Sequence, residues 1–541
     1  MVQYLNNGSS GFQQFMASKD ASKKSNFGSI LVWIGIAILA GWLISHWFMP
    51  SKTTVNSQQP TEPIMTQTED MSHIPVQELR HSKLNAKVQG MRISQIQLND
   101  YKETGGDKSV SVLSGENEFA EIGILANGTA APTINSKWER GTDLVKSWDS
   151  NIAPLQWKNS DGVVFARVIN IDENNPYVIN IQYIIKNPTA RDFSITPYAR
   201  IVRDAGASSF GMAAGAATGG IAMAGGDIER EDWKSIGKKS YAFTTPTGFV
   251  GFEDQYWQTI AHLDTGDQTI KLKPLTDGRL QAETSAAAIS VPAGQSVTLV
   301  SNIFAGPKTP EVLSAAAAAI PGIEQTIDYG WFWFLARPFL WTINYIHGFV
   351  GNYGVAIILF TILLRILMWP LTKKSFTGMA AMQKMQPEMQ RIQKMYANDK
   401  MRMQQEMLLM YKKQGASPMS GCLPMILQIP IFFALYKALI ISVPMRQAGF
   451  LWMNDLAVMD PYFILPILMG ATMWWQQHLQ SAASKTIEAD PNNPMAQTQK
   501  MMKWLPLIFT AMFAWMPAGL VLYWTVSNLF GIGQMWWIKK R

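Results

Sequence analysis

The stretch Tyr353-Gly-Val-Ala-Ile-Ile-Leu-Phe-Thr-Ile-Leu-Leu-Arg365-Ile-Leu-Met-Trp-Pro370 has the length and apolarity of a transmembrane helix, yet it contains an arginine. Arginine keeps its proton in proteins, and placing it in a bilayer costs about 2.5–3.5 kcal/mol on insertion scales. Thr361 lies one helical turn earlier on the same face. Arg365 could snorkel to the headgroups near Pro370, or it could face a water-filled cavity inside a helical bundle. We favour the cavity.

The composition indicates a membrane protein. Of 541 residues, 48% are hydrophobic, only 16% are charged, and 20 are tryptophan. Lysine and arginine outnumber aspartate and glutamate by 46 to 39, but the excess lies beside apolar segments, as in cytoplasmic flanks. Sequence-specific nucleic-acid binding is therefore not expected. One cysteine and six scattered histidines give no metal-ligand spacing, so we expect neither a metal nor a cofactor.

The chain begins with a polar segment and an apolar run. Residues 1–26 are predicted to be a cytoplasmic tail, and residues 27–49 resemble a signal sequence. The run exceeds twenty residues and lacks a small-x-small cleavage pattern, so we interpret it as an uncleaved transmembrane anchor. Residues 50–79, rich in Ser, Thr, Gln and Pro, are expected to form a flexible linker.

Residues 80–326 predict a β-sandwich that ends in a helical segment. Residues 163–171 and 177–185 flank the turn Asp172-Glu-Asn-Asn-Pro176, which indicates a hairpin, and further short strands are expected at 269–273, 287–291 and 296–304. The Ala/Gly tract at 205–226 is predicted to be a mobile surface loop. The charged residues that follow it, around Arg230, are predicted to form a solvated turn.

Residues 327–350 are rich in aromatic side chains, beginning with Trp331-Phe-Trp-Phe334. A core helix is an alternative, but this density just before a spanning segment favours an amphipathic helix at the membrane interface.

The segment 373–414 is predicted to be a cytoplasmic helical hairpin, divided at Asn398-Asp399. Its positive charges include Lys373, Lys374, Lys384, Arg391, Lys394, Lys400 and Arg402. The many methionines could pack the hairpin, or they could present a surface that accepts varied apolar segments. Both interpretations remain open.

The remaining apolar regions complete a membrane core over 351–541. Spans are predicted at about 352–370, 422–443, 461–478, 504–516 and 518–538, with Lys437 snorkelling at the end of the second. A polar cytoplasmic loop is expected at 479–503, and Pro517-Ala-Gly519 separates the last two spans. With the N-terminal anchor this gives six spans, five of them in the core, and places both termini in the cytoplasm.

Polar side chains recur inside these spans and predict a shared hydrophilic cavity. Besides Arg365 they are Thr361, Gln428, Thr472, Gln476, Thr525, Ser527 and Asn528. The spans contain no acidic residue that could pair with Arg365, and an unpaired cation beside water suits a passing anionic group from another protein.

Several motifs then point to a family. They are Asp328-Tyr-Gly-Trp, His347-Gly-Phe-Val-Gly-Asn352, Pro370-Leu-Thr-Lys373, Gly421-Cys-Leu-Pro424, Asp460-Pro-Tyr, Leu465-Pro-Ile-Leu-Met-Gly470 and Pro517-Ala-Gly-Leu-Val-Leu-Tyr523. Over 328–538 the chain resembles the YidC family of membrane protein insertases, most of all its Gram-negative form.

The resemblance implies a five-helix bundle around a groove, a large periplasmic domain and a bacterial inner-membrane location. Arg365 would be the positive residue of the groove, and Thr361 and Tyr523 would contact the substrate. Trp524 is also expected to line this groove. The basic hairpin would recruit substrate. Implied partners are the lipid bilayer, nascent membrane proteins, the Sec translocon and the ribosome, although a long basic tail for ribosome contact is not found before Arg541.

We therefore expect a non-enzymatic insertase and chaperone that uses a hydrophilic groove and no nucleotide, since no Walker motif is present. One alternative is a small-anion transporter or channel with Arg365 as its binding site. Another is an envelope enzyme whose β-sandwich acts on carbohydrate.

Overall fold

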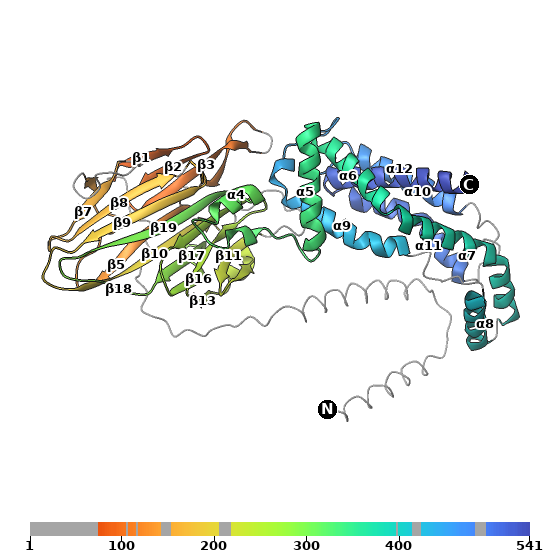
Figure 1. The fold of residues 1–541 in the computed structure, drawn as a ribbon, viewed down its shortest axis with the longest axis horizontal. Coiled ribbons are helices and arrows are strands. Elements are labelled where there is room, and N and C mark those ends of the chain that lie inside the picture. The colour runs from red at the N-terminus through yellow and green to blue at the C-terminus, as the bar shows by residue number, and fades with distance from the viewer. Residues whose placement is uncertain are drawn as a thin grey trace, which may run out of the picture. The chain divides into compact units, whose positions relative to one another are not determined.

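A computed structural model describes residues 74–103, 106–114, 117–141, 153–171, 173–204, 218–396, 399–413, 423–481 and 494–540. The predicted N-terminal tail, the anchor and nearly all of the linker lie outside these residues. The described chain has a β-rich part followed by a helical part (Figure 1).

The β-rich part contains two antiparallel sheets. The first has ten strands in the order β1-β2-β3-β5-β10-β17-β16-β13, with β18 on β10 and β4 on β3. Its strands are β1 (Val76–Arg80), β2 (Leu84–Gln89), β3 (Arg92–Lys102), β4 (Ser109–Leu113), β5 (Phe119–Asn127), β10 (Phe193–Asp204), β13 (Tyr241–Thr245), β16 (Gln268–Pro274), β17 (Arg279–Ala286) and β18 (Ile289–Val291).

The second sheet has nine strands in the order β12-β11-β14-β15-β19-β9-β8-β7-β6. They are β6 (Glu139–Arg140), β7 (Leu155–Lys158), β8 (Val164–Ile171), β9 (Val178–Lys186), β11 (Gly219–Ala224), β12 (Asp227–Glu231), β14 (Gly248–Glu253), β15 (Trp257–Leu263) and β19 (Ser296–Pro307). The predicted β8–β9 hairpin is confirmed, because Val164 pairs with Lys186 and Ile171 with Ile179.

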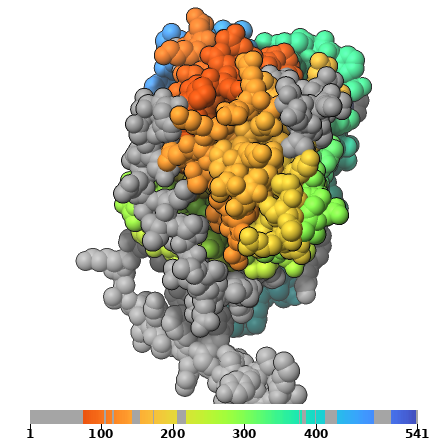
Figure 2. Space-filling view, turned by 90° about the vertical axis from the view of Figure 1, so that its left-hand side faces the viewer, coloured from red at the N-terminus to blue at the C-terminus, as the bar shows by residue number. Residues whose placement is uncertain are grey.

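Apolar side chains from both sheets form one continuous core, as expected when alternating residues of two sheets face each other. The Tyr183 hydroxyl on β9 donates to the Ile122 carbonyl on β5, 2.9 Å away, and so links the two sheets. The core also contains a charged group: the fully buried Glu121 pairs with Arg92 and Arg200. Figure 2 shows one face of this part, where red to orange residues from the start of the described chain lie beside yellow residues.

The Ala/Gly tract is not a surface loop throughout, and this prediction was wrong for residues 219–224. They form β11, whose residues are almost all buried between β12 and β14. Small residues are needed here: a Cβ at Gly219 would lie 2.2 Å from the Glu231 carbonyl oxygen, and one at Gly220 would lie 2.6 Å from Ile236. The predicted solvated turn is likewise wrong in part. It is strand β12, where Arg230 pairs with buried Glu253 at 2.8 Å.

Within the described residues, three short helices accompany the sheets, and nine further helices follow. The first group is α3 (Trp233–Ile236), α4 (Pro310–Ala316) and the 3-10 helix η1 (Ile323–Thr326). The second is α5 (Trp333–Val350), α6 (Tyr353–Leu367), α7 (Trp369–Met395), α8 (Lys400–Lys413), α9 (Leu423–Ile441), the 3-10 helix η3 (Val443–Met445), α10 (Ile464–Ser481), α11 (Pro494–Phe513) and α12 (Ala518–Lys540).

The arginine-bearing helix ends earlier than predicted. α6 stops at Leu367, and the chain bends by 60° into α7, with Pro370 inside the first turn of the new helix. Proline is tolerated there because the first helical amides lack intrahelical acceptors. The hairpin division is confirmed, since α7 ends at Met395 and α8 starts at Lys400, where Asp399 accepts from the Arg402 amide.

Two other helices also differ in their limits. The second half of the expected cytoplasmic loop is helical, because α11 begins at Pro494 rather than at residue 504. The break before Pro517 is confirmed, since α11 ends at Phe513 and α12 begins at Ala518. Within the described ranges no single helix meets the length and hydropathy expected of a membrane span, whereas α6 and the first turns of α7 meet them together as a bent pair.

Candidate functional site at Arg365

Arg365, on α6, points toward α12. Its Nε donates to the Ser527 hydroxyl at 2.7 Å, and one of its terminal nitrogens donates to the same oxygen. The guanidinium has five N–H donors, and the described part of the chain offers it no acceptor besides Ser527. Arg365 is half-buried, and none of its nitrogens is a buried atom without a partner, so the donors that Ser527 does not use stay accessible to water or to a visiting group.

No carboxylate of the described residues pairs with this cation. Among the ion pairs that the described residues make, none includes Arg365. The structure therefore does not place the guanidinium in a dry ion pair. Its protein contact is a neutral hydroxyl, which orients the charge without cancelling it.

Tyr523 lies one helical turn before Ser527 on α12 and extends the same polar group. Its hydroxyl accepts from Gln428 Nε2 of α9 at 2.8 Å, and it also interacts with Ser527. Tyr523 is 2% exposed, so its hydroxyl needs a partner inside the protein. The pairs Arg365–Ser527 and Gln428–Tyr523 thus meet on α12, one helical turn apart, and we name these four residues the Arg365 cluster.

Other predicted residues form a second group between α10 and α12. Asn528 Nδ2 donates to Thr472 Oγ1 at 3.3 Å, and both side chains are buried. Gln476 lies one turn after Thr472, and its amide nitrogen would lie 2.9 Å from a Cβ at Gly531. This glycine lets the two helices approach where the glutamine side chain lies between them.

Two further predicted residues belong to neither group. Thr361 is fully buried, and its hydroxyl donates to the Ile357 carbonyl of its own helix at 2.6 Å. Trp524 packs against Phe432, Phe509 and Phe513, with ring centroids 5.0–5.9 Å apart. Thr361 therefore uses its hydroxyl within the helix, as threonines in helices commonly do, and Trp524 lies in an aromatic cluster.

Lys437 has a partner that the sequence analysis missed. Its ammonium group forms an ion pair with Asp328 at 2.6 Å, so the snorkelling interpretation does not describe this side chain. Asp328 comes just before α5, and the pair ties that segment to α9. The motif Asp328-Tyr-Gly-Trp is visible in the sequence. However, Asp328 lies 109 positions from Lys437, so no local pattern indicates the pairing.

The basic hairpin presents its charges outward. Lys373, Lys374, Arg391, Lys394 and Arg402 are exposed, whereas the side chains of Lys384 and Lys400 lie outside the description. Between α7 and α8, Met385, Met389 and Met410 pack with Tyr411 in a small core. Methionine packing therefore accounts for part of the pattern, while Met395 and Met401 remain exposed.

The aromatic helix α5 keeps one apolar face uncovered. Trp331 and Trp333 before and at its start, and Trp341, Tyr345 and Phe349 along it, are more than half exposed. Its opposite face packs into the helical core through Phe339, Leu340 and Ile343. A helix with large aromatic side chains outside and a packed inner face is typical of membrane-interface helices.

The described residues thus join an antiparallel β part to a helical part in which Arg365 has no carboxylate partner. Two family models match the chain: "YidC periplasmic domain" over residues 80–342 and "60Kd inner membrane protein" over residues 345–541.

Curated relatives extend over nearly the whole chain. The membrane protein insertase YidC of Aeromonas hydrophila is 33% identical over 551 aligned positions, which cover 94% of this chain and 97% of that protein. The insertase of Ectopseudomonas mendocina is 37% identical and covers 68% of this chain and 62% of that protein. A crystal structure titled as an active YidC insertase aligns with 85% of this chain at 18% identity and a TM-score of 0.35.

The chain belongs to the YidC family of membrane protein insertases, on the strength of the sequence matches. It is an inner-membrane insertase with a periplasmic domain rich in antiparallel sheet, and its substrates are membrane proteins. The relatives' names describe a non-enzymatic role.

Proposed function

We propose that the Arg365 cluster is the place where the polar end of an entering membrane protein is held during insertion. One observation carries the proposal: the guanidinium is oriented by Ser527 and has no carboxylate partner among the described residues. A cation in this state keeps its attraction for carboxylates and for carbonyl groups of an unpaired backbone.

The second polar group and the apolar helix surfaces would serve the rest of the substrate. Thr472, Gln476 and Asn528 offer neutral partners to a polar tail without adding charge. Exposed apolar side chains on α9 and α11, such as Phe433, Leu507 and Ile508, would accompany the substrate's apolar segment into lipid. Burial of that segment releases about 25 cal/mol per Å² of apolar surface, which provides a driving force without nucleotide.

The topology and partners are part of the proposal. The domain limits are those stated above, with an anchor at 27–49, the β domain at 80–326, the interfacial helix at 327–350 and the core at 351–541. We infer six spans with both termini in the cytoplasm, cooperation with the Sec translocon, and recruitment of ribosome-bound chains by the basic hairpin. The exposed charges on α7 and α8 support the last point.

The proposal is tested by insertion of a single-span substrate with a short polar tail. Arg365→Ala should reduce insertion strongly, whereas Arg365→Lys should retain much of it if charge rather than guanidinium geometry matters. Arg337→Ala, which removes an exposed arginine on α5, is the matched control for loss of one positive charge. Unchanged insertion by Arg365→Ala would contradict the proposal.

A further inference from the structure

The segment between α9 and α10, residues 442–463, is held in an unusual backbone conformation; we name it the α9–α10 loop. Four non-glycine residues of the described chain have a positive φ, and three of them lie here: Gln447 at 61°, Leu451 at 54° and Phe463 at 56°. Each such residue costs about 1–2 kcal/mol, so surrounding contacts must hold the loop in this shape.

Those contacts join the starts of three helices. The Leu456 and Val458 carbonyls accept from the Gly519 and Ala518 amides at 2.9 and 2.7 Å, and so satisfy donors at the start of α12. Asn352, which caps α6, donates to the Gly449 carbonyl at 3.1 Å.

The loop also covers the apolar interior below it. The Phe450 ring packs directly on Gly354 of α6, where a Cβ would lie 2.2 Å from ring carbons. Met453 and Leu456 are 1% and 2% exposed and belong to the helical core. A Cβ at Gly519 would touch both Ile357 and the Leu456 carbonyl oxygen, so Ile357 lies directly beneath the loop.

The Asp460 side chain accepts hydrogen bonds from several parts of the loop. It is 1% exposed, and its carboxylate accepts three N–H groups: Trp452 Nε1 at 3.0 Å, the Tyr462 amide at 3.0 Å and the Leu465 amide at 2.7 Å. The Trp452 and Tyr462 bonds lie within the loop, and the Leu465 bond fixes the loop to the start of α10. None of the ion pairs among the described residues involves Asp460, so these three hydrogen bonds stabilise its buried carboxylate.

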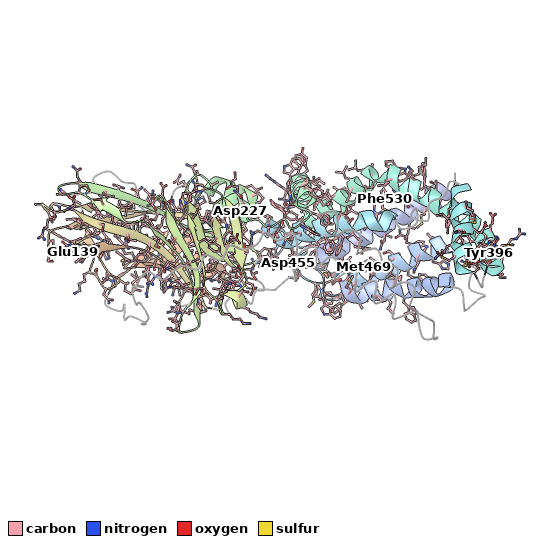
Figure 3. The ribbon with its side chains drawn as sticks, turned by 90° about the horizontal axis from the view of Figure 1, so that it is seen from below. Glu139, Asp227, Tyr396, Asp455, Met469 and Phe530 are labelled. Atoms are coloured by element: carbon pink, nitrogen blue, oxygen red, sulfur yellow. The ribbon has the colours of Figure 1, made fainter. Side chains whose placement is uncertain are left out.

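The loop lies at the end of the bundle away from the hairpin. Figure 3 shows Asp455 of the loop and Tyr396 of the hairpin at opposite ends of the helices, with Met469 and Phe530 between them. A loop that covers one end of a bundle and is hydrogen-bonded to the starts of α6, α10 and α12 is suited to close that end against water.

We propose that Asp460 is a positioning residue for insertion: through Trp452 and the Leu465 amide of α10 it holds the α9–α10 loop closed over the periplasmic end of the bundle. The inference deepens the proposed function, because a tail held at Arg365 needs a site that opens toward one side only. Loss of the Asp460 bonds would release the strained loop and admit water from the periplasm.

The test is side-specific labelling of a cysteine beneath the loop. Ile357→Cys is introduced into the full chain with Cys422→Ser, and spheroplasts are treated with a membrane-impermeant maleimide from the periplasmic face. Asp460→Asn and Trp452→Phe should label about tenfold faster than the parent, the factor expected for loss of one charge-assisted hydrogen bond. Asn454→Ala, an exposed side chain of the same loop, should leave labelling unchanged.

A second reporter separates opening from unfolding. Met535→Cys is buried toward the other end of α12 and should stay unlabelled in Asp460→Asn if only the loop opens. If both reporters label in that variant, Trp452→Phe decides between the two explanations, because it keeps an aromatic side chain but lacks the indole N–H donor. Equal labelling of Ile357→Cys in Trp452→Phe and Asn454→Ala would overturn the proposal.

The assay needs no substrate, so its result is independent of the role of Arg365. Normal insertion by Arg365→Ala together with faster labelling would remove the proposed function and keep the loop as a seal. Reduced insertion by Arg365→Ala together with unchanged labelling would keep the proposed function and remove the loop as a seal.

Discussion

The Arg365 guanidinium donates two hydrogen bonds to the hydroxyl of Ser527, a residue 162 positions later in the chain. The contact joins α6 to α12 at the only arginine of the predicted spans. Because a hydroxyl orients the cation but leaves its charge intact, it is a contact whose loss should affect function more than stability.

Ser527→Ala should therefore reduce insertion of a short-tailed substrate by about fivefold, while the protein loses no more than about 1 kcal/mol of stability. Water can replace the lost hydroxyl, which explains the small effect on folding. Ser527→Thr keeps an acceptor and should insert nearly normally. Insertion rates and thermal melting of the detergent-solubilised protein measure both effects. A large loss of stability with normal insertion would assign Ser527 a purely structural role.

Loss of the Gln428–Tyr523 hydrogen bond should affect stability more than insertion. Tyr523→Phe leaves the Gln428 amide without its acceptor in the bundle, at a cost of about 1–3 kcal/mol. Gln428→Met should relieve most of this cost in the double variant, because no donor is then left unpaired. A double-mutant cycle on thermal unfolding checks the coupling. Additive effects of the two changes would show that the bond contributes nothing.

Gly470 is predicted to be a site where α10 and α11 must approach closely. A Cβ there would lie 1.9 Å from Thr510 Oγ1, so Gly470→Ala should lower the melting temperature. Thr510→Ala should restore it, because it removes the clashing atom. Gly533→Ala, with nothing within 4 Å of the added Cβ, is the matched control and should be neutral or stabilising. Equal melting temperatures for the two alanine variants would refute the close contact.

His262 predicts acid sensitivity of the β domain. Burial lowers the pKa of His262 below its ordinary 6.5, and the Gly248 carbonyl, 2.7 Å from Nδ1, and Asp264 offset this only in part. The unfolded chain therefore binds the extra proton more readily, and stability should fall as pH drops below 6.5, by at most about 1.4 kcal/mol per pH unit.

Pulse proteolysis of the β domain in the full chain, in denaturant series at pH 7 and pH 5.5, measures this loss. His262→Gln should show a smaller loss between the two pH values than the parent, whereas His81→Gln, nearer the surface, should not. The same pH dependence in parent and His262→Gln would contradict the prediction.

Local patterns predicted much of the fold. Short alternating runs between turn residues gave the β8–β9 hairpin and the strands at β16 and β19, because alternation reports directly which face is buried. The loop prediction for the Ala/Gly tract is wrong at residues 219–224, because β11 depends on close approach of neighbouring strands, which only the assembled sheet imposes. Likewise, Pro370 marked a bend but was placed at the end of a span rather than in the first turn of α7.

The candidate site was predictable in composition but not in connectivity. An arginine in an apolar run is visible in the sequence, and so are the polar residues on other spans. Which of them meet is decided by helix packing: Ser527 and Tyr523 face Arg365 and Gln428, whereas Asn528, one position on, faces Thr472. The Lys437–Asp328 pair could not be predicted either, because it joins distant segments of the chain. The Asp460 bonds could not be predicted because they depend on the backbone shape of the loop.

The most direct test of the central claim varies the charge of the substrate tail and removes the charge at Arg365. A single-span substrate is made with zero, one or two acidic residues in its short tail, and its insertion is measured with the parent insertase and with Arg365→Ala. The account predicts that acidic residues alter insertion by the parent and that this dependence vanishes in Arg365→Ala. The same dependence on tail charge in both proteins would contradict it, because the tail would then not sense the cation at Arg365.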